Sequence, residues 1–493
     1  MLNSQIEQLL EKYKTIKQYN YVLFFKEFIE SSYFQIILII FIIFFIYHLL
    51  LISLIYHFNN LSQKTVFITN KEHRQNIHNL LLHFKNTTDK ITLNSSNSKF
   101  NTIIDIDKKN NILHIGGNAN LFNTLKILNN MGYSLNVTPN TDNLTIGELY
   151  SYSKCGATTF KHGEFFHNVK QIEIITGNGN VLIANNNQHS DLFHLSANSF
   201  DSLGHILSLW VDIKPIYNYV YSETFHYSNF SDFINAIETK KISNIDFLDG
   251  TIFGPNNFVL ITGKNEEYIN TKFPLLGTEL DIPYYEHVNK GYKAFFHYHD
   301  YIYRWDVDGY YSLYENNILF KLFKSKLFRQ IFFHKKLMKE SILKTIFNFL
   351  TPEIKFNETH FNSSSGDFIL PHAKCNNFFK WYNKHISLYP LYIRPITFTK
   401  TSPLLQCSKN AIDFGVGYGV FQNKMPSIKL LRKCMKKTYK MDGDILKYNN
   451  IYKNNSEFWK YYPNKLFEKY TKIKKIYDKN NHLYSIADKP TIK

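Results

Sequence analysis

An uncharged, apolar stretch near the start of the chain limits its possible folds more than any other feature. Residues Phe34 to Tyr56 contain no Asp, Glu, Lys or Arg. As a helix this stretch would be about 35 Å long, enough to cross a hydrocarbon core of about 30 Å. A cleaved signal peptide would be shorter and would end in small residues, and a buried helix of a soluble protein is seldom apolar on every side. The sequence therefore predicts a single-pass transmembrane anchor over residues 34–58.

The segments that flank the anchor do not fix its orientation. Residues 1–33 carry apolar side chains at helical spacing with Lys and Glu between them. This pattern is typical of an amphipathic helix, which either lies on a membrane surface or is simply solvated. Basic residues are balanced on the two sides of the anchor, so the charge bias that normally sets orientation is missing.

The cysteines favour a cytosolic position for the large domain. The chain has four cysteines, at positions 155, 375, 407 and 434, and no C-x-x-C pair. This spacing predicts neither a disulfide framework nor a zinc site, and we expect no metal. Reduced thiols facing the cytosol are the expected arrangement.

Length and charge narrow the choice of partners. A chain of 493 residues is long enough for about two or three domains and a large core. The formal net charge is +17, but the lysines are spread along the chain without a compact arginine stripe or a nucleic-acid-binding motif. We therefore expect no nucleic-acid partner, and attraction to anionic membrane lipid is the more natural use of the charge. The sequence does not set the oligomeric state.

Strand and helix patterns alternate after the anchor. Apolar alternation predicts strands at residues 66–68, 90–93, 103–106 and 112–115, the last two joined as a hairpin. Apolar residues at helical spacing predict helices over 72–84 and 120–131, the second ending at Gly132 in the left-handed conformation. This alternation is typical of an α+β cofactor-binding domain.

The stretch from Pro139 to Pro215 combines strands with an extended loop. Residues 145–147 are expected to turn after a short apolar run, and residues 151–163 are small and polar with little periodicity, so we expect no face of that loop to enter a core. Strands are predicted at 169–175, 181–183 and 205–213, the first two joined by a hairpin turn at 177–180. A loop of small residues offers backbone N–H groups to an anion, as phosphate-binding loops do.

The order of these motifs resembles the Δ24-sterol reductase family, which is part of the larger group of vanillyl-alcohol-oxidase-like flavoproteins. The resemblance covers nearly all of the chain after residue 60. The matching residues are Pro139, Asp142, Leu144–Gly147, Lys161, Gly163, Asp191–Phe193, Leu203–Gly204, Val259–Gly263, Asp300–Asp306, Tyr389–Tyr392, Ile412–Gly415, Glu457–Trp459 and Tyr477–Lys479.

The resemblance implies a two-subdomain FAD-binding fold of the vanillyl-alcohol-oxidase type. The FAD-binding domain would span residues 61–216, a substrate (cap) domain residues 217–426, and a helical segment at 427–493 would complete the fold. No His matches the position that carries a covalent flavin in related oxidases, so FAD would be non-covalent, with NADPH as the electron donor. The implied cofactor-binding residues are Thr92, Asn94, Ser95, Ser96, Pro139, Thr145, Gly147, Thr158, Thr159, Lys161, Gly163, Ser202, Leu203 and Gly204.

Several glycines of the family pattern are replaced in this chain. The family has glycine where this chain has Glu148, Tyr152, Lys154 and Asp201, and the first expected phosphate loop, residues 89–99, has no glycine. A side chain at such a position collides with the cofactor or forces a positive φ at a cost of about 1–2 kcal/mol per residue. Asp201 would also repel a diphosphate, which Lys154 could partly offset.

The second half of the chain supplies the expected substrate side. Residues 300–306 are predicted as a strand with Tyr301 and Tyr303 on one face and Arg304 on the other. With the resemblance, these three residues are the candidate catalytic or pocket-wall groups; a surface Arg–Asp pair over an aromatic core is the alternative. Further strands are predicted at 389–395 and 412–419, and a basic, aromatic helix at 320–349 would rest either on the bilayer or on its own domain.

Three functions remain open on the sequence alone. The resemblance implies a membrane-anchored, FAD-linked oxidoreductase that reduces an isolated alkene of a sterol-like lipid by hydride transfer from the flavin. The replaced glycines allow a catalytically decayed family member that acts as a membrane-tethered scaffold or lipid-binding protein. The same fold also serves flavin oxidases that act on another alcohol or sugar.

Overall fold

The computed structural model describes Tyr47 and residues 65–85, 98–139, 144–152, 154–277, 284–305, 366–398, 402–405, 407–416, 427–446, 452 and 454–486. The chain divides into a unit of residues 1–62 and a unit of residues 63–493, and all described elements belong to the second. The predicted segments at 1–33 and 320–349 lie outside the described residues, as does the predicted anchor apart from Tyr47. Within the described ranges, every helix is too short or too polar to cross a bilayer.

The first half of the described unit forms a seven-stranded sheet built around one long strand. The path through this sheet is β1-β2-β3-β7-β5-β6, and β4 pairs with β7 off that path. The strands are β1 (Val66–Phe67), β2 (Thr102–Asp107), β3 (Ile112–Gly116), β4 (Tyr133–Leu135), β5 (Val169–Ile175), β6 (Val181–Asn185) and β7 (His205–Pro215). All pairs are antiparallel except β1 with β2. The strands predicted at 66–68, 103–106, 112–115, 169–175, 181–183 and 205–213 are thus confirmed, while the one predicted at 90–93 lies outside the described residues.

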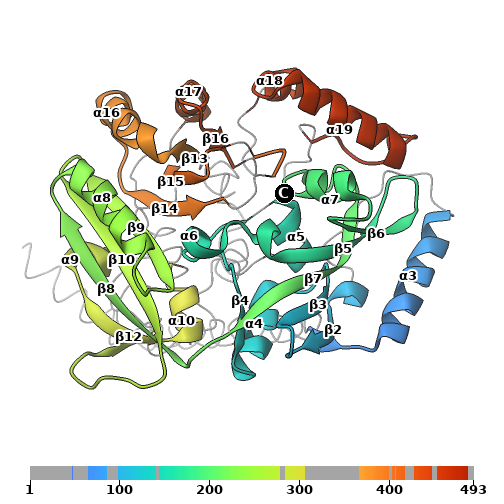
Figure 1. Cartoon of the computed structure of the whole chain (residues 1–493), viewed down its shortest axis with the longest axis horizontal. Coiled ribbons are helices and arrows are strands. Elements are labelled where there is room, and N and C mark those ends of the chain that lie inside the picture. Colours follow the sequence, from blue (N-terminus) through green and yellow to red (C-terminus); the bar gives the residue numbers. More distant parts are fainter. Residues whose placement is uncertain are drawn as a thin grey trace, which may run out of the picture. The chain divides into compact units, whose positions relative to one another are not determined.

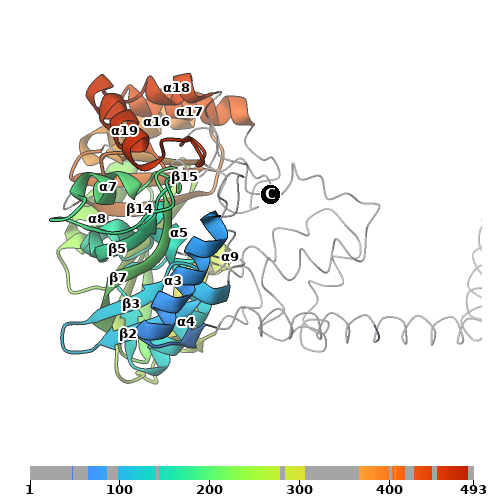
Figure 2. The ribbon, with the colours of Figure 1, turned by 90° about the vertical axis from the view of Figure 1, so that its right-hand side faces the viewer.

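Two helices of this half lie where the sequence predicts them. Helix α3 (Asn70–Lys85) and helix α4 (Leu121–Asn130) confirm the predictions for 72–84 and 120–131. The side chain of Asn120 accepts a hydrogen bond from the N–H of Asn123 and so satisfies one free donor of the first turn of α4. Gly132 follows the helix at φ +78°, the left-handed conformation that ends helices. Figure 2 shows α3 lying across the strands of this sheet.

The second half forms a nine-stranded sheet with the order β11-β12-β8-β10-β9-β14-β15-β13-β16. Its strands are β8 (Tyr219–Tyr227), β9 (Phe247–Gly254), β10 (Asn257–Glu266), β11 (Leu275–Leu276), β12 (Lys293–His297), β13 (Gly366–Pro371), β14 (Leu391–Thr397), β15 (Asn410–Val416) and β16 (Asp444–Ile445). The helices beside it are α8 (Phe230–Lys241), α9 (Tyr284–Lys290), α10 (Tyr298–Ile302), α16 (Cys375–His385) and α17 (Ile428–Tyr439) (Figure 1). The strands predicted around 389–395 and 412–416 are confirmed; residues 417–419 lie outside the described residues.

The end of the chain returns to the first sheet. Helix α18 (Asn455–Trp459) leads into α19 (Asn464–Tyr477), which lies next to α7 (Ser190–Ser196) in Figure 1. The N–H of Asn178, in the hairpin turn between β5 and β6, donates to the carbonyl of Tyr477. Lys474 donates to the carbonyl of Ser202 at 2.8 Å, and Tyr470 donates to its hydroxyl at 2.7 Å. The C-terminal helix therefore supports the loop before β7 directly.

Candidate functional site

The segment at residues 145–151 is a helix, not the turn that the sequence suggested. Helix α5 (Ile146–Ser151) begins at Thr145, whose hydroxyl accepts from the N–H of Glu148 while the Glu148 carboxylate accepts from the N–H of Thr145. The N–H of Gly147 donates to the carbonyl of Gly117 at 2.7 Å. A Cβ at Gly147 would lie 2.9 Å from that same oxygen, so the close approach of α5 to the end of β3 requires glycine here.

The loop at residues 154–163 is buried, which corrects the expectation that no face of it could enter a core. Cys155, Ala157 and Phe160 are all 5% exposed or less, and the short helix α6 (Thr159–His162) forms part of the loop. The reason is that small side chains let the backbone itself pack. A Cβ at Gly156 would lie 1.8 Å from the carbonyl oxygen of Thr138.

This loop is held between the two sheets by bonds to its carbonyls. The N–H of Leu248, in β9, donates to the carbonyl of Ala157 at 2.8 Å. The guanidinium of Arg394, in β14, donates to the carbonyl of Cys155 at 3.1 Å. Residues that the resemblance assigns to the cofactor, Thr158 and Gly163 among them, therefore lie where the first sheet meets the second. Gly163 has φ +71°, which favours glycine.

The loop before β7 keeps a backbone that suits glycine although most of its residues are not glycine. Asn198, Phe200 and Asp201 all have φ between +57° and +62°. For residues with a Cβ this conformation costs about 1–2 kcal/mol each, and such strain concentrates at functional sites. Gly204 ends the loop, where a Cβ would collide with the side chain of Ile174.

The side chains at the positions where the resemblance leads us to expect glycine are engaged with the protein's own groups. Asp201 accepts a hydrogen bond from the Ser151 hydroxyl at 2.5 Å, and the Tyr152 ring stacks on Phe200 with centroids 4.7 Å apart. Burial raises the pKa of Glu148, and the neighbouring Asp201 charge adds to that shift. Burial also raises the pKa of Tyr152. These groups form one small cluster, defined here as the α5 cluster.

The described residues fit FAD by two features of their own. The hydroxyl of Thr158 and the amide nitrogen of Asn198 are buried and have no hydrogen-bond partner among the described residues. An unpaired buried polar group costs about 1–3 kcal/mol, and a bound cofactor would supply these two atoms with a partner. Thr158 lies in the loop at residues 154–163, and Asn198 lies in the loop before β7. Both loops contain glycine positions at which a Cβ would collide with neighbouring atoms. Thr92 and residues 94–96 lie outside the described residues.

The predicted catalytic residues lie in the core of the second half, and the strand predicted at 300–306 is wrong. Residues 298–302 form α10, followed by a turn, because the Tyr-His-Asp-Tyr-Ile segment packs one helical face on β8 and β12. Tyr301, Tyr303 and Arg304 are all 5% exposed or less. The Tyr301 ring stacks under the guanidinium of Arg304 at 4.0 Å, and burial raises the pKa of Tyr301.

Arg304 is paired with a carboxylate that sequence reasoning missed. Its guanidinium donates to Asp249 at 2.6 Å, and the same carboxylate oxygen accepts from Trp305 at 3.0 Å and from the Tyr392 hydroxyl at 3.1 Å. Asp249 is fully buried in the middle of β9. No local pattern marks Asp249, because its partners come from residues that are 55 to 143 positions away.

A second buried charge cluster lies where the 154–163 loop meets the second sheet. Arg394 donates to Asp413 at 2.5 Å and lies 3.7 Å from Asp367. Burial raises the pKa of the Asp413 carboxyl well above its usual value, and the nearby Asp367 charge adds to the shift. Burial lowers the pKa of Lys154 to about 8, opposed by Asp367. Asp413 stood in a matched motif, but Asp367 and Arg394 carried no signal in the sequence.

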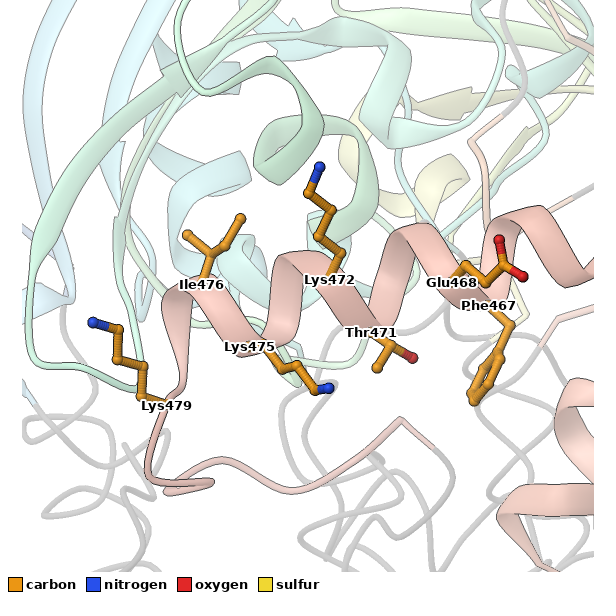
Figure 3. A pocket seen from close by; sticks show the side chains of 7 residues that line it. All are labelled: Phe467, Glu468, Thr471, Lys472, Lys475, Ile476 and Lys479. Atoms are coloured by element: carbon orange, nitrogen blue, oxygen red, sulfur yellow. The ribbon is translucent and has the colours of Figure 1, made fainter.

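Neither a metal-binding group nor a surface depression in the described part of the chain adds to the candidate site. Among the described residues, no group of His, Cys, Asp and Glu is arranged to hold a metal ion. A shallow depression runs along α19, lined by Phe467, Glu468, Thr471, Lys472, Lys475, Ile476 and Lys479 (Figure 3). Figure 3 shows the side chains of Lys472 and Ile476 on one side of the helix and those of Thr471 and Lys475 on the other. None of the predicted site residues lines it.

Comparison with known proteins defines the class of this site. The sequence profile of the FAD binding domain matches residues 74–185. This range holds most of helix α3, all of β2, β3, α4 and α5, and the buried loop at 154–163. The chain therefore contains an FAD-binding domain, and its two mixed sheets fit a fold of the vanillyl-alcohol-oxidase type.

The relatives extend the likeness beyond that domain. The chain is 21% identical over 397 residues to the Δ24-sterol reductase of Rattus norvegicus, covering 76% of this chain and 75% of that protein. It is 22% identical over 380 residues to the Δ24-sterol reductase of Homo sapiens, covering 74% and 72%. Cytokinin dehydrogenase 1 of Arabidopsis thaliana is 30% identical over 111 residues, 22% of this chain and 19% of that protein. The resemblance to the Δ24-sterol reductase family that the sequence predicts is confirmed.

Proposed function

We propose that this chain is a membrane-anchored, FAD-dependent oxidoreductase that reduces an isolated alkene of a sterol-like lipid, with NADPH as the electron donor. The observation that carries the proposal is the extent of the likeness. Similarity to Δ24-sterol reductases covers about three quarters of the chain, whereas the FAD binding domain covers residues 74–185 alone. The likeness therefore includes the second sheet, which would lie on the substrate side of the fold.

The chain's own residues would bind and orient the cofactor without a covalent bond. FAD, when bound, supplies hydride transfer. The Thr158 hydroxyl and the Asn198 amide are buried donors without a hydrogen-bond partner among the described residues. At Gly147, Gly163 and Gly204 a Cβ would collide with neighbouring atoms or strain the backbone. The other assigned residues, Thr145, Thr159, Pro139, Ser202 and Leu203, lie on the same two loops or next to them. Lys161, which the resemblance also assigns to the cofactor, instead pairs with Asp246 at 3.1 Å and belongs to a separate cluster.

The second sheet would exclude water and place the substrate. Tyr301, Tyr303 and Arg304 are the proposed wall groups, and their burial among aromatic rings suits an apolar lipid. Since Arg304 is already paired with Asp249, its part would be to orient the neighbouring tyrosines rather than to bind an anion. A proton for the reduced alkene must come from an acid, and Tyr301 or Tyr303 would be that donor.

The membrane anchor is part of the proposal. Residues 34–58 would hold the enzyme at a membrane of the endoplasmic-reticulum type with the large domain in the cytosol. A substrate dissolved in lipid would then reach the site without leaving the bilayer. Insertion is tested by alkaline extraction and protease protection of the full chain. Release from the membrane at high pH would contradict a transmembrane anchor.

The reaction is tested with the detergent-solubilised full chain loaded with FAD. Under anaerobic conditions NADPH should bleach the flavin absorbance, and a sterol with an isolated side-chain alkene should restore it and gain two hydrogens by mass spectrometry. If FAD binds but neither NADPH nor the sterol changes its spectrum, the reductase proposal fails while FAD binding stands. Formation of peroxide from O₂ with an alcohol would instead indicate an oxidase.

The α5 cluster favours one alternative, a family member without catalysis. Glu148, Tyr152 and Asp201 pack where the family has glycine, and the first phosphate loop has no glycine. In that case the protein would act as a membrane-tethered scaffold or lipid-binding protein, and the wild-type chain would take up no flavin.

A further inference from the structure

Lys214 lies near the end of β7 and points into the interior. The ammonium of Lys214 is buried, and none of its hydrogens finds an acceptor among the described residues. The Phe247 ring is nearby, with its centroid 5.6 Å from the ammonium nitrogen. Taking a charged ammonium out of water without pairing it is costly, so a protein normally pairs such a group or leaves it neutral. Within the described part of the chain, the ammonium of Lys214 therefore lacks the hydrogen-bond acceptor or paired counter-charge that a buried lysine normally has.

The groups around Lys214 come from two other segments of the chain, and two of the three are Lys or His side chains. Lys161 and His162 lie at the end of α6, and Asp246 lies just before β9. Lys161 pairs with Asp246 at 3.1 Å, and the second Asp246 oxygen accepts from the N–H of Asn265 at 2.9 Å. Lys161 and Asn265 thus already engage both oxygens of Asp246. This one carboxylate lies beside two lysines and a histidine.

The electrostatics of the cluster indicate an excess of positive potential. Burial lowers the pKa of Lys214 to about 8, and the Lys161 charge lowers it further while Asp246 opposes the shift. Burial lowers the pKa of His162 to about 3, with Lys214 and Lys161 adding to that effect. His162 is therefore neutral at physiological pH and can donate or accept a hydrogen bond. A bound anion would neutralise the positive charge that Asp246 alone does not compensate.

We propose that Lys161, His162 and Lys214 form a binding site for a phosphate group at the junction of the two sheets. The Lys161 side chain is 46% exposed and so accessible to solvent, whereas the ammonium of Lys214 is buried. A doubly charged phosphate would take the ammonium of Lys214 as its inner partner and would compete with Asp246 for Lys161. The site follows from the cluster itself and does not depend on the proposed reaction.

The test is phosphate-dependent stabilisation of the detergent-solubilised full chain. Inorganic phosphate, against chloride at equal ionic strength, should raise the melting temperature saturably by about 1–3 °C. The variant Lys214→Met should abolish this response, whereas Lys170→Met should retain it. Lys170 is a matched control, because it is 55% exposed and pairs with Asp212 at the surface of the same sheet. A wild-type protein without a response, or an equal response in Lys214→Met, overturns the proposal.

A second variant keeps the test valid if Lys214→Met does not fold. Asp246→Asn removes the competing carboxylate and should tighten phosphate binding several-fold; unchanged or weaker binding contradicts the proposed competition. Adenosine 2′,5′-bisphosphate distinguishes the source of the phosphate. Binding tighter than inorganic phosphate, lost in Lys214→Met, indicates a nucleotide, and equal binding indicates free phosphate.

The site is also separable from the FAD site. The phosphate response is measured with and without saturating FAD. A response that survives FAD supports a separate site, and one that FAD abolishes assigns these residues to the cofactor and overturns the proposal. Because the response of the FAD-free protein is measured first, failure to bind FAD and failure to bind phosphate remain distinguishable.

Discussion

Replacing Asp249 with Asn should destabilise the protein more than any surface charge change. The Asp249 carboxylate has its Arg304 partner at 2.6 Å, and both side chains are at most 2% exposed. The same oxygen also accepts from Trp305 and from the Tyr392 hydroxyl. The variant Asp249→Asn keeps the shape of the side chain but leaves the guanidinium of Arg304 buried without a counter-charge.

The size of the effect follows from the pair's burial. At a separation of about 4 Å and an effective dielectric constant of about 20, two unit charges attract by about 4 kcal/mol. Breaking a buried pair by removing one partner typically costs about 3–5 kcal/mol, because the remaining charge stays desolvated. We therefore expect Asp249→Asn to lower the free energy of unfolding by about 3–5 kcal/mol. Replacing both partners, as Asp249→Leu with Arg304→Met, should cost less than the single change.

Urea unfolding of the detergent-solubilised full chain, followed by tryptophan fluorescence, measures this effect, and Trp305 reports on the cluster itself. Asp212→Asn serves as the control, because its partner Lys170 is 55% exposed and such surface pairs contribute about 0–1 kcal/mol. A loss below about 1 kcal/mol for Asp249→Asn would refute the reasoning. An FAD affinity unchanged in the double variant would show that Arg304 does not hold the cofactor.

Two further predictions concern other parts of the first sheet. Asp201→Gly should raise FAD affinity about fivefold, because it removes about 1 kcal/mol of like-charge repulsion and a strained φ of +59°. Ser151→Ala removes the hydrogen bond to Asp201 but keeps the charge, so it should leave FAD affinity nearly unchanged. Equal gains in FAD affinity for both variants would contradict the charge argument. His114 stacks on Trp210, and burial, with the His73 charge adding to it, lowers the pKa of His114 to about 4. In the unfolded chain His114 takes up a proton near pH 6.5, whereas in the folded chain it stays neutral down to about pH 4. The free energy of unfolding should therefore fall by the order of 2–3 kcal/mol as the pH drops from about 6.5 to 4. His114→Phe should flatten that part of the profile in melts across pH 4–7, and a profile that keeps its full slope would count against the assignment.

The sequence was most informative where periodicity is strong. The helix at Leu121–Asn130 and the strands of the first sheet followed from apolar spacing, with Asn120 and Gly132 marking where the helix begins and ends. Periodicity failed for residues 154–163, because a loop of small residues is buried through its backbone and not through an apolar face. It also failed at Tyr298–Ile302, where packing against the second sheet outweighs the β-propensity of the tyrosines.

The candidate site was predictable only as an order of motifs. The glycines at 147, 163 and 204 were found from the resemblance, and the structure gives a steric reason for each. The buried partners Asp249 and Arg394 were not predictable, since a charge pair between distant strands leaves no local signal.

Flavin titration of the wild-type full chain tests the central claim most directly. After purification in detergent and reconstitution with FAD, the account predicts one flavin per chain with a Kd of about 1 µM or tighter, which corresponds to about 8 kcal/mol of binding free energy. Denaturation should release the flavin intact, because the bond is non-covalent. A chain that stays folded but acquires no flavin absorbance at saturating FAD would contradict the account, and the side chains of the α5 cluster would then be the reason.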